Sequence, residues 1–445
     1  MIQPSIRQAA EAIATGTTSA CDLLASARAN ALAAAALNAI AHVDWDAAEA
    51  QARRLDAELL AGHRRGPLHG IPVSIKDLFN VQGMPTRAGT RAPLPDPGLE
   101  EATLVSRLRA AGALIFAKTN MHEIALGATG ENRWTGDVLN PHDPARQSGG
   151  SSSGAAAAVA AGIGLGAVGS DTGGSVRIPA AFCGVTGFKP SFGAIPLTGG
   201  LHLSWTCDHA GPLARSVDDC VLLYEAMALR RADHGTVARA PRLAVPEDWL
   251  APRMSDAVRE RFARALEAAR ARGASVEAVP AGAMLAQAWT CYTPIVRAEG
   301  AFIHRAALAA GGEGFSEMVL PPLLDGATLL AGQYLEALQQ RETVRSGLAA
   351  ILAGFDAMVL PTSPVLPPLR GQTEVEVAGG KTMSTREAVL GQTAAFSLVG
   401  LPTLTLPMGA AEALPTGLQV VGRADGDASV LALGRWLEAA LAAPH

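Results

Sequence analysis

Hydrophobic and polar positions along the chain follow two periods, which predict an α/β fold. Short apolar runs that are rich in β-branched residues and end at Gly, Pro or charged residues are typical of buried strands. They predict strands at 71–75, 113–118, 242–245, 276–279, 356–361, 396–407 and 417–422. Amphipathic segments predict helices at 46–60, 103–110, 216–229, 255–272 and 429–441. The alternation of the two kinds of segment favours helices packed on a sheet.

The same pattern shows no internal repeat and no linker, so we expect a single domain over residues 1–445. Its parts are an N-terminal helical layer (1–62), a central core (63–235), a variable region expected on the substrate side (236–355) and C-terminal strands with a last helix (356–445). In the first part a helix is predicted to begin after Ser19, with Asp22 three residues on. Further helices are predicted to start at 120–123 and to fill 281–345.

Residues 148–180 form a stretch of small residues around which the rest of the chain is predicted to be arranged. Gly149-Gly150 and Gly173-Gly174 permit tight turns, so each pair lets a serine and its neighbouring N–H groups face a ligand. Such turns are typical of anion-binding sites. Between them, strong helix formers at 152–161 predict a helix, which places Ser151 at or just before its positive end.

Three other interpretations of this stretch fail on its context. Residues 164–169 spell the dinucleotide pattern G-x-G-x-x-G, but they follow a predicted helix, and no acidic residue lies between Asp171 and Asp208 to bind a ribose. Residues 150–154 fit the nucleophile elbow G-x-S-x-G, yet a loop-like sequence stands where that motif needs a strand. The uncharged run 154–170 is built from Ala and Gly and ends at Asp171, which favours a buried helix over a membrane span.

Composition and charge argue against several classes of protein. The 445 residues are 49% hydrophobic but only 4% aromatic, which suits closely packed helices on a sheet. The formal net charge of -5 and the lack of a Lys/Arg run argue against nucleic-acid binding. Five scattered cysteines without C-x-x-C spacing predict reduced thiols and neither a zinc site nor a catalytic cysteine. Residues 1–13 carry charges and no continuous apolar core, so we expect no signal peptide, no membrane contact and a cytoplasmic location.

The candidate chemistry is acyl transfer, which needs a nucleophile, a base and N–H groups for the oxyanion. Ser151 and Ser175 stand beside the glycine pairs, and Lys76 follows the apolar run 71–75, where it would be buried at the end of a strand. Taken alone, each has a simpler explanation, because most lysines are solvated and most Gly/Ser stretches are turns in ligand-binding loops. His122 is a further candidate base, but it has no nearby Cys or Asp pattern and we interpret it as structural.

Taken together, the motifs resemble the amidase signature family. The resemblance rests on GPLHGIPVSIKDLF, GGSSSGAAAAVAAG and SDTGGSVRIPAAFCGVTGFKPSFG, and on the C-terminal runs FSLVGLPTLTLP and LPTGLQVVG. It extends from about residue 60 to about residue 430 and weakens between 235 and 355. It implies a large mixed β-sheet core covered by helices on both faces. Ser151 follows Lys76 by 75 positions and Ser175 follows Ser151 by 24, in agreement with the family pattern.

The resemblance also implies a role for each catalytic residue. Ser175 would attack the substrate carbonyl, and Ser151 would pass the proton of its hydroxyl to Lys76. The bond between Gly150 and Ser151 would be a cis peptide bond. To act as a base, Lys76 must be largely neutral, which requires that burial and nearby donors lower its pKa.

The loop around Ser175 is expected to hold the oxyanion. By the same resemblance, the donors would be the backbone N–H groups of Thr172, Gly173, Gly174 and Ser175. Asp171 and Arg177 match the family pattern DTGGSxR and are expected to support this loop. The sequence departs from the usual GGSSGGSAAA at Ser153 and Ala155, where the family commonly has Gly and Ser, and it has Ser397 where Asn is frequent.

These features predict a cytoplasmic amidohydrolase that cleaves a C–N bond in a small-molecule amide or carbamate without a metal ion or cofactor. Bulky apolar residues in 281–345 favour an apolar or aryl acyl group, aryl carbamates included. Within the family, the alternative is the A subunit of a glutamine-dependent tRNA amidotransferase, which would need a partner protein and an ammonia path. Outside it, the alternative is a catalytically silent binding protein on the same scaffold. A homodimer is compatible with the sequence.

Overall fold

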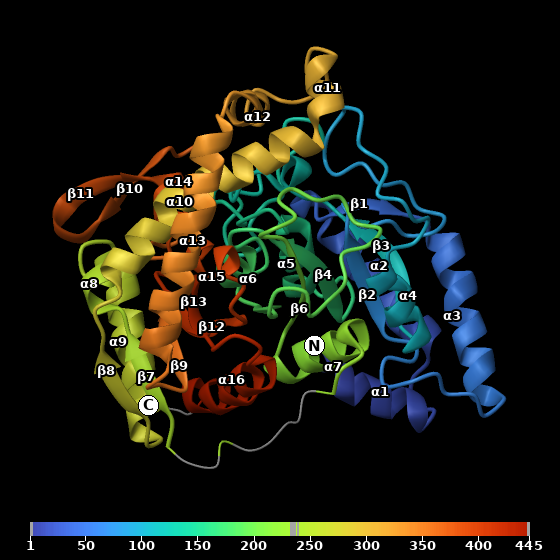
Figure 1. Ribbon diagram of the computed structural model, residues 1–445. Coiled ribbons are helices and arrows are strands. Elements are labelled where there is room, and N and C mark those ends of the chain that lie inside the picture. Colours follow the sequence, from blue (N-terminus) through green and yellow to red (C-terminus); the bar gives the residue numbers. More distant parts are fainter. Residues whose placement is uncertain (1–2, 232–236, 238–239, 443–445) are drawn as a thin grey trace.

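Figure 1 shows the computed structural model of the chain, which describes residues 3–231, 237 and 240–442. Within this part, one sheet of eleven strands crosses the molecule and a separate hairpin has two. The sheet strands are β1 (Ile40–Val43), β2 (Pro72–Lys76), β3 (Leu114–Thr119), β4 (Gly166–Asp171), β5 (Thr186–Lys189), β6 (His209–Ala214), β7 (Arg242–Val245), β8 (Ser275–Ala278), β9 (Ala357–Pro361), β12 (Thr403–Ala411) and β13 (Leu414–Val421). The hairpin strands are β10 (Glu374–Val377) and β11 (Lys381–Ser384).

The strands are arranged as a mixed sheet in the order β1-β3-β2-β4-β6-β5-β12-β13-β9-β7-β8. Parallel pairs join β2 to β3 and β4, and join β7 to β8 and β9. The central strands from β4 to β9 pair antiparallel. Because β2 and β4 are parallel neighbours, with Ile75 opposite Val168, their carboxyl ends meet at the same edge of the sheet.

Helices cover both faces of this sheet (Figure 1). The helices are α1 (Ile6–Ala14), α2 (Ala20–Ala33), α3 (Trp45–Leu60), α4 (Thr103–Ala110), α5 (Ser153–Ala160), α6 (Arg177–Cys183), α7 (Val217–Ala228), α8 (Glu247–Leu250), α9 (Asp256–Ala271), α10 (Gly282–Ile303), α11 (Arg305–Ala309), α12 (Leu320–Ala327), α13 (Ala331–Leu352), α14 (Thr385–Gly391), α15 (Ala394–Leu398) and α16 (Asp427–Leu441), with short 3₁₀ turns η1 (Ala35–Leu37), η2 (Glu123–Ala125) and η3 (Ala378–Gly380). Neighbouring residues of β6 face different layers, since Leu213 packs in the core of α2, α3 and α5, and Ala214 in that of α1, α7 and α16. The expected fold class is confirmed.

Several predicted elements are found where the sequence places them. The predicted helix at 103–110 is α4, and the helix predicted after Ser19 is α2, whose capping box joins Ser19 and Asp22. The strand, helix and strand predicted between 242 and 279 are β7, α9 and β8, with parallel pairing of the two strands. The side chain of Lys76 is buried at the end of β2, as predicted.

Four helical predictions are wrong. The run 281–345 is not all helical, because residues 310–319 separate α11 from α12. The uncharged run 154–170 is helical only to Ala160, and β4 begins at Gly166.

Residues 1–62 are not all helical, because Ile40–Val43 forms the edge strand β1 by pairing with β3. No helix begins at 120–123. The chain forms only the turn η2 there, since Ile124 and Ala125 adopt positive φ of 42° and 63°, and the Ile124 N–H donates to the Ala88 carbonyl at 2.8 Å. Contacts with distant segments thus override the local helical pattern.

The C-terminal strand is also shorter at its start than predicted. The apolar run 396–407 was expected to be one strand, but α15 ends at Leu398 and β12 begins at Thr403. Gly400, with φ of 75°, and Pro402 lie between them and end the helix before the strand starts. The hairpin of β10 and β11 has no counterpart among the predicted elements.

The boundary expected between residues 235 and 236 lies outside the described residues, and the division into four parts stays a prediction. Among the helices that the structure describes, none is long and apolar enough to cross a bilayer.

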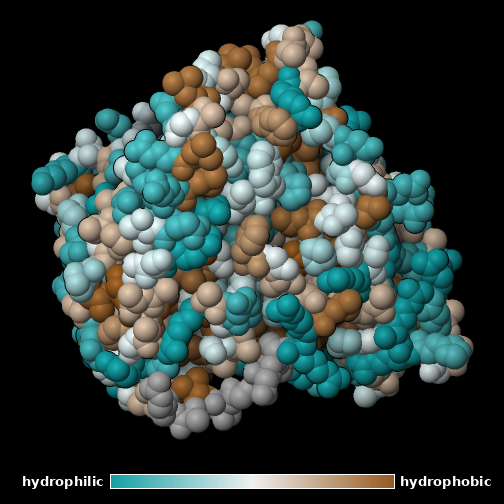
Figure 2. Space-filling view, viewed as in Figure 1, coloured by the Kyte–Doolittle hydropathy of each residue, from teal (hydrophilic) through white to brown (hydrophobic). Residues whose placement is uncertain are grey.

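Figure 2 shows hydrophilic residues over α3 and apolar residues gathered around α12, where Leu324 and Leu330 are 48% and 70% exposed.

The sheet buries most of the lysines of the chain. Of four lysines, Lys76, Lys118 and Lys189 are fully buried on β2, β3 and β5, and only Lys381 is exposed. Lys118 forms an ion pair with Asp77 at 3.1 Å and donates to Thr86 Oγ1 at 2.9 Å. Burial lowers the pKa of Lys118 and raises the pKa of Asp77, so each ion depends on the other for compensation.

We expect Lys118→Met to destabilise the fold by about 3 to 5 kcal/mol, because it leaves the Asp77 carboxylate buried without its partner. The measurement is the shift of the urea unfolding midpoint. Lys381→Met is the matched control on the exposed hairpin and should change the unfolding free energy by less than about 0.5 kcal/mol. Equal midpoints for the two variants would contradict the prediction.

Candidate active site

The predicted catalytic residues lie together at the carboxyl edge of β2 and β4. Lys76 is the last residue of β2, Ser151 precedes α5, and Ser175 lies in the turn between β4 and α6. Since α5 begins at Ser153, Ser151 lies just before a helix N-terminus, as the sequence predicts. All three are buried, and Ser175 is the most exposed at 4%.

The amine of Lys76 is held by two serine hydroxyls. Its Nζ donates to Ser151 Oγ at 2.7 Å and to Ser170 Oγ at 2.9 Å. Burial lowers the pKa of Lys76 to about 7, although the charges of Asp171 and Asp208 raise it. A large neutral fraction is therefore present near pH 7, as a general base requires.

Backbone hydrogen bonds tie Ser151 and Ser175 to each other and to the sheet edge. The Gly150–Ser151 peptide bond is cis, as the resemblance implies. The Ser152 N–H donates to the Ser175 carbonyl at 3.2 Å, and the His122 N–H donates to the Ser151 carbonyl at 3.1 Å. Among the described residues the Ser175 hydroxyl has no hydrogen-bond partner, and Ser175 lines a cavity of about 570 Å³. This hydroxyl is thus available to a ligand in the cavity.

Residues 172–175 form a turn, the donor turn, that offers a row of backbone N–H donors. In the part of the chain that the structure describes, no acceptor is bonded to the N–H groups of Thr172, Gly173, Gly174 and Ser175. A side chain is excluded at both glycines, because a Cβ on Gly173 would overlap Tyr292 Oη, and Gly174 has φ of +142°. The turn can therefore supply several N–H groups to an oxyanion, which is the geometry that acyl transfer needs.

A buried ion pair supports this turn, as expected from the DTGGSxR pattern. Arg177 donates through Nε and Nη2 to the two oxygens of Asp171, at 3.0 and 2.9 Å. Ser397 Oγ donates to Asp171 at 2.7 Å and accepts from Arg177 at 2.5 Å, so a serine at this position still bridges the pair. Burial would raise the pKa of Asp171, but the charge and hydrogen bonds of Arg177 outweigh it and hold that pKa well below its usual range.

The structure adds two residues that the sequence analysis did not single out. Ser170, in β4, is the second acceptor for Lys76 and lies 94 positions from it in the chain. Asp208 accepts from Thr172 Oγ1 at 2.6 Å and from the N–H groups of Leu203 and Ser204 at 2.9 and 3.0 Å. It therefore fixes the first residue of the donor turn. The placement of Ser170 directly before the DTGGS motif was the one signal that pointed to it.

His122 lines the same cavity as Ser175. Burial and the charge of Lys76 lower the pKa of His122 to about 4, so the ring is neutral at pH 7. Its Nδ1 lies 3.3 Å from Thr129 Oγ1, and its Nε2 occupies the space that a Cβ on Gly127 would need. The ring packs into the cavity wall, in keeping with the structural interpretation.

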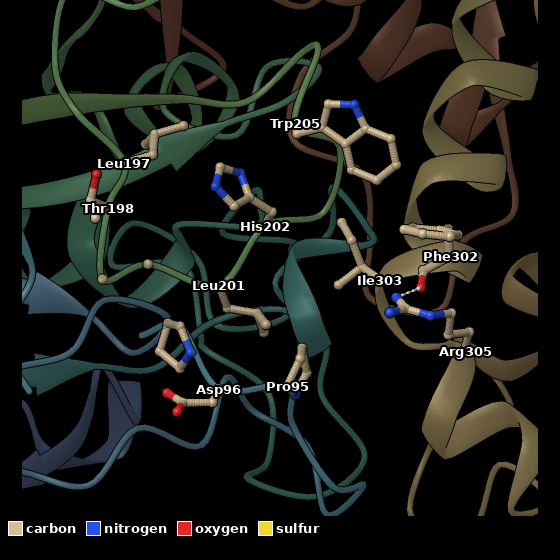
Figure 3. A pocket seen from close by; sticks show the side chains of 13 residues that line it. Pro95, Asp96, Leu197, Thr198, Leu201, His202, Trp205, Phe302, Ile303 and Arg305 are labelled. Atoms are coloured by element: carbon tan, nitrogen blue, oxygen red, sulfur yellow. Dashed lines mark hydrogen bonds between the residues drawn. The ribbon is translucent and has the colours of Figure 1, made fainter. Parts of the chain in front are cut away.

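Figure 3 shows a second cavity, of about 580 Å³, between the loop 197–205 and the end of α10. Its side chains include His202, Trp205 and Phe302, the last two in edge-to-face contact with ring centroids 5.7 Å apart. None of the predicted catalytic residues lines it. His202 Nδ1 lies 3.0 Å from Asp208 Oδ2, so Asp208 lies between this cavity and Thr172 of the donor turn.

The fold is shared with known amidases. A family model described as Amidase matches residues 23–431, and the chain belongs to this family. The resemblance to amidase signature enzymes is thereby confirmed, and family membership supports an enzyme that acts on carbon–nitrogen bonds.

Individual relatives extend the similarity over nearly the whole chain. The chain is 50% identical to the protein in a crystal structure of an amidase, with a TM-score of 0.95 over 98% of this chain and 99% of that one. It is 31% identical, with a TM-score of 0.90 over 98% of both chains, to one from a vestigial protein complex that reveals the evolutionary origins of an s-triazine catabolic enzyme. It is also 36% identical to the A subunit of the glutamyl-tRNA(Gln) amidotransferase of Azoarcus sp. (strain BH72), over 89% of each chain.

We expect kcat/KM for amide hydrolysis to rise with pH through a midpoint near 7 and then to level off. Below its folded-state pKa of about 7, Lys76 carries a proton and cannot accept one from the serines, and above it the amine is free. The measurement is a pH–rate profile between pH 5 and pH 9. A profile that falls between pH 6 and pH 8 would contradict a neutral lysine base.

Asp208→Asn should move this midpoint to lower pH, because the charge of Asp208 raises the pKa of Lys76. It should also reduce kcat by about 10- to 100-fold, since Thr172 and its N–H lose a fixed position. The check is the pH–rate profile of the variant. Asp218→Asn, on the half-exposed side of α7, is the control and should leave the midpoint in place. A loss of rate without any shift of the midpoint would reject the effect of the Asp208 charge on Lys76 and leave only the positioning of Thr172.

Proposed function

We propose that the chain is an amidohydrolase that cleaves the C–N bond of a small-molecule amide or carbamate through an acyl-enzyme on Ser175. The observation that carries the proposal is the buried Lys76, whose lowered pKa and 2.7 Å hydrogen bond to Ser151 provide a base beside the cavity of Ser175. The unbonded N–H groups of the donor turn supply the second requirement of acyl transfer. The chemistry proposed needs neither a metal ion nor a cofactor.

The proposed reaction runs through two proton relays. The Ser175 hydroxyl gives its proton to Ser151, Ser151 gives its own to neutral Lys76, and Ser175 Oγ bonds to the substrate carbonyl carbon. The carbonyl oxygen becomes an oxyanion that accepts from the donor turn. When the C–N bond breaks, Lys76 returns a proton through Ser151 to the leaving nitrogen. Water then attacks the acyl-enzyme by the same relay, which releases the acid and restores Ser175.

The lining of the cavity supports an apolar or aryl substrate body. The apolar members of this lining are Leu126, Leu203, Tyr292, Val296, Met318, Pro322, Val389 and Leu390. Of the bulky residues in 281–345, Tyr292 contributes to this cavity, whereas Phe302 and Tyr334 line other hollows. We propose aryl amides and aryl carbamates as the first substrates to test.

A second candidate function is favoured by the curated relatives, which include the A subunits of two glutamyl-tRNA(Gln) amidotransferases at 36% and 34% identity. In that role the chain would depend on a partner protein. The two functions separate experimentally: the isolated chain hydrolyses aryl amides or carbamates in the first case, and in the second it releases ammonia from glutamine only with a partner. A silent binding protein would do neither.

We expect a fluorophosphonate to add one adduct to the native chain and none to Ser175→Ala, because Ser175 is the nucleophile. Lys76→Ala should lower turnover of p-nitroanilides and p-nitrophenyl carbamates by orders of magnitude, about 10³-fold or more, since activation and leaving-group protonation both fail. Intact-mass analysis and absorbance assays make the two measurements. An adduct that persists in Ser175→Ala, or near-native rates in Lys76→Ala, would remove that residue from the site.

A further inference from the structure

An arginine that lines the Ser175 cavity has no acidic partner in the part of the chain that the structure describes. Arg386, on α14, lines this cavity together with Arg297 of α10, and α14 lies beside α10 in Figure 1. Arg297 pairs with Asp325 at 2.9 Å. Arg386 donates to Thr293 Oγ1 at 3.2 Å, and among the described residues it pairs with no carboxylate.

The charges around Arg386 favour an anion at this place. Burial lowers the pKa of Arg386, Tyr292 raises it, and the positive charge of Arg297 lowers it. Glu131, a carboxylate that also lines the cavity, accepts from the Gly371 N–H at 2.6 Å and forms no ion pair with Arg386 among the described residues. Two guanidinium groups that face one cavity repel each other, and a bound anion relieves this repulsion.

A pair of stacked aromatic rings on α10 connects Arg386 to the donor turn. Tyr292 Oη packs against Gly173 of the donor turn, and the rings of Tyr292 and Trp289 stack with centroids 6.3 Å apart. The two residues are three positions apart on α10, so they share one face of the helix. The guanidinium of Arg386 lies over the Trp289 ring at 4.8 Å, which fixes its plane. Val389 and Leu390 continue the apolar lining from α14.

We propose that Arg386 binds a carboxylate at the far end of the substrate, whose acyl carbonyl lies at Ser175 and whose apolar or aryl body lies along Tyr292, Val389 and Leu390. The substrate class is therefore an amide of a dicarboxylic acid, with one acyl group in the scissile bond and the other end free as a carboxylate. The inference rests on the proposed function for the carbonyl end only. A guanidinium fork matches a carboxylate through two parallel N–H donors, which a lysine does not reproduce.

The test compares mono-p-nitroanilides of the straight-chain dicarboxylic acids, from succinic to suberic, with p-nitroanilides of monocarboxylic acids in which a methyl group replaces the carboxylate. We expect the best dicarboxylic member to exceed its neutral partner in kcat/KM by about 10- to 100-fold, as a charge-assisted hydrogen bond predicts. Arg386→Gln should bring this ratio close to one, and Arg386→Lys should restore only part of it. Arg264→Gln, an exposed arginine on α9, is the control and should keep the native ratio.

Ser175→Ala separates this inference from the proposed function. Calorimetric binding of the same pairs to this variant measures the role of Arg386 without turnover, with Arg386→Gln added as the second change. Carboxylate-dependent binding that Arg386→Gln removes would support the carboxylate site. The absence of hydrolysis and of a fluorophosphonate adduct would reject the hydrolase but would leave this binding result standing. Equal kcat/KM or equal affinity for charged and neutral partners along the series would overturn the role of Arg386 and leave hydrolysis of neutral amides standing.

Discussion

The proposed active site depends on the removal of Lys76 from water. An ammonium ion loses most of its favourable hydration when it is buried. The hydroxyl groups of Ser151 and Ser170 accept a hydrogen bond from a charged or a neutral amine alike. The fold meets this requirement by placing the lysine on a central strand under helices on both faces. Lys118 is buried beside it with a carboxylate at 3.1 Å and is compensated as an ion. The hydrogen-bond partner of each buried lysine therefore determines its role. The two hydroxyls leave the proton of Lys76 exchangeable, whereas the Asp77 carboxylate retains the proton of Lys118.

Asp171 makes two opposing contributions to this site. Its carboxylate orders the donor turn, because it accepts from the Val176 N–H at 3.1 Å and from Nε and Nη2 of Arg177. The same charge raises the pKa of Lys76 and so reduces the neutral fraction of the base. Arg177 binds Asp171 bidentately and links the turn to Gln419 of β13 at 2.6 Å. The carboxylate that orders the proposed oxyanion donors thus also favours the charged form of Lys76.

The sequence predicted the parts of the site that depend on local backbone chemistry. Gly173 and Gly174 mark the donor turn because few other residues adopt its geometry, and the strand before Lys76 follows from a short β-branched run. Ser170 and Asp208 were missed, because their contacts join positions 94 and 36 residues apart and leave no periodic trace. The edge strand β1 and the helix α15 were missed for a related reason. Short segments take their structure from the strand or helix that they meet, and pairing with β3 decides the first case.

Helix α10 links recognition of the substrate body to the catalytic turn. The absence of a side chain at Gly173 has two effects, since it leaves the backbone N–H accessible and lets Tyr292 Oη occupy the space that a Cβ would need. Thr393 Oγ1 closes the other side by donating to the Gly173 carbonyl at 2.5 Å. The donor turn is therefore held between α10 and the segment before α15. In the proposed function, a substrate body that fits along Tyr292 without moving it leaves this turn in place for catalysis.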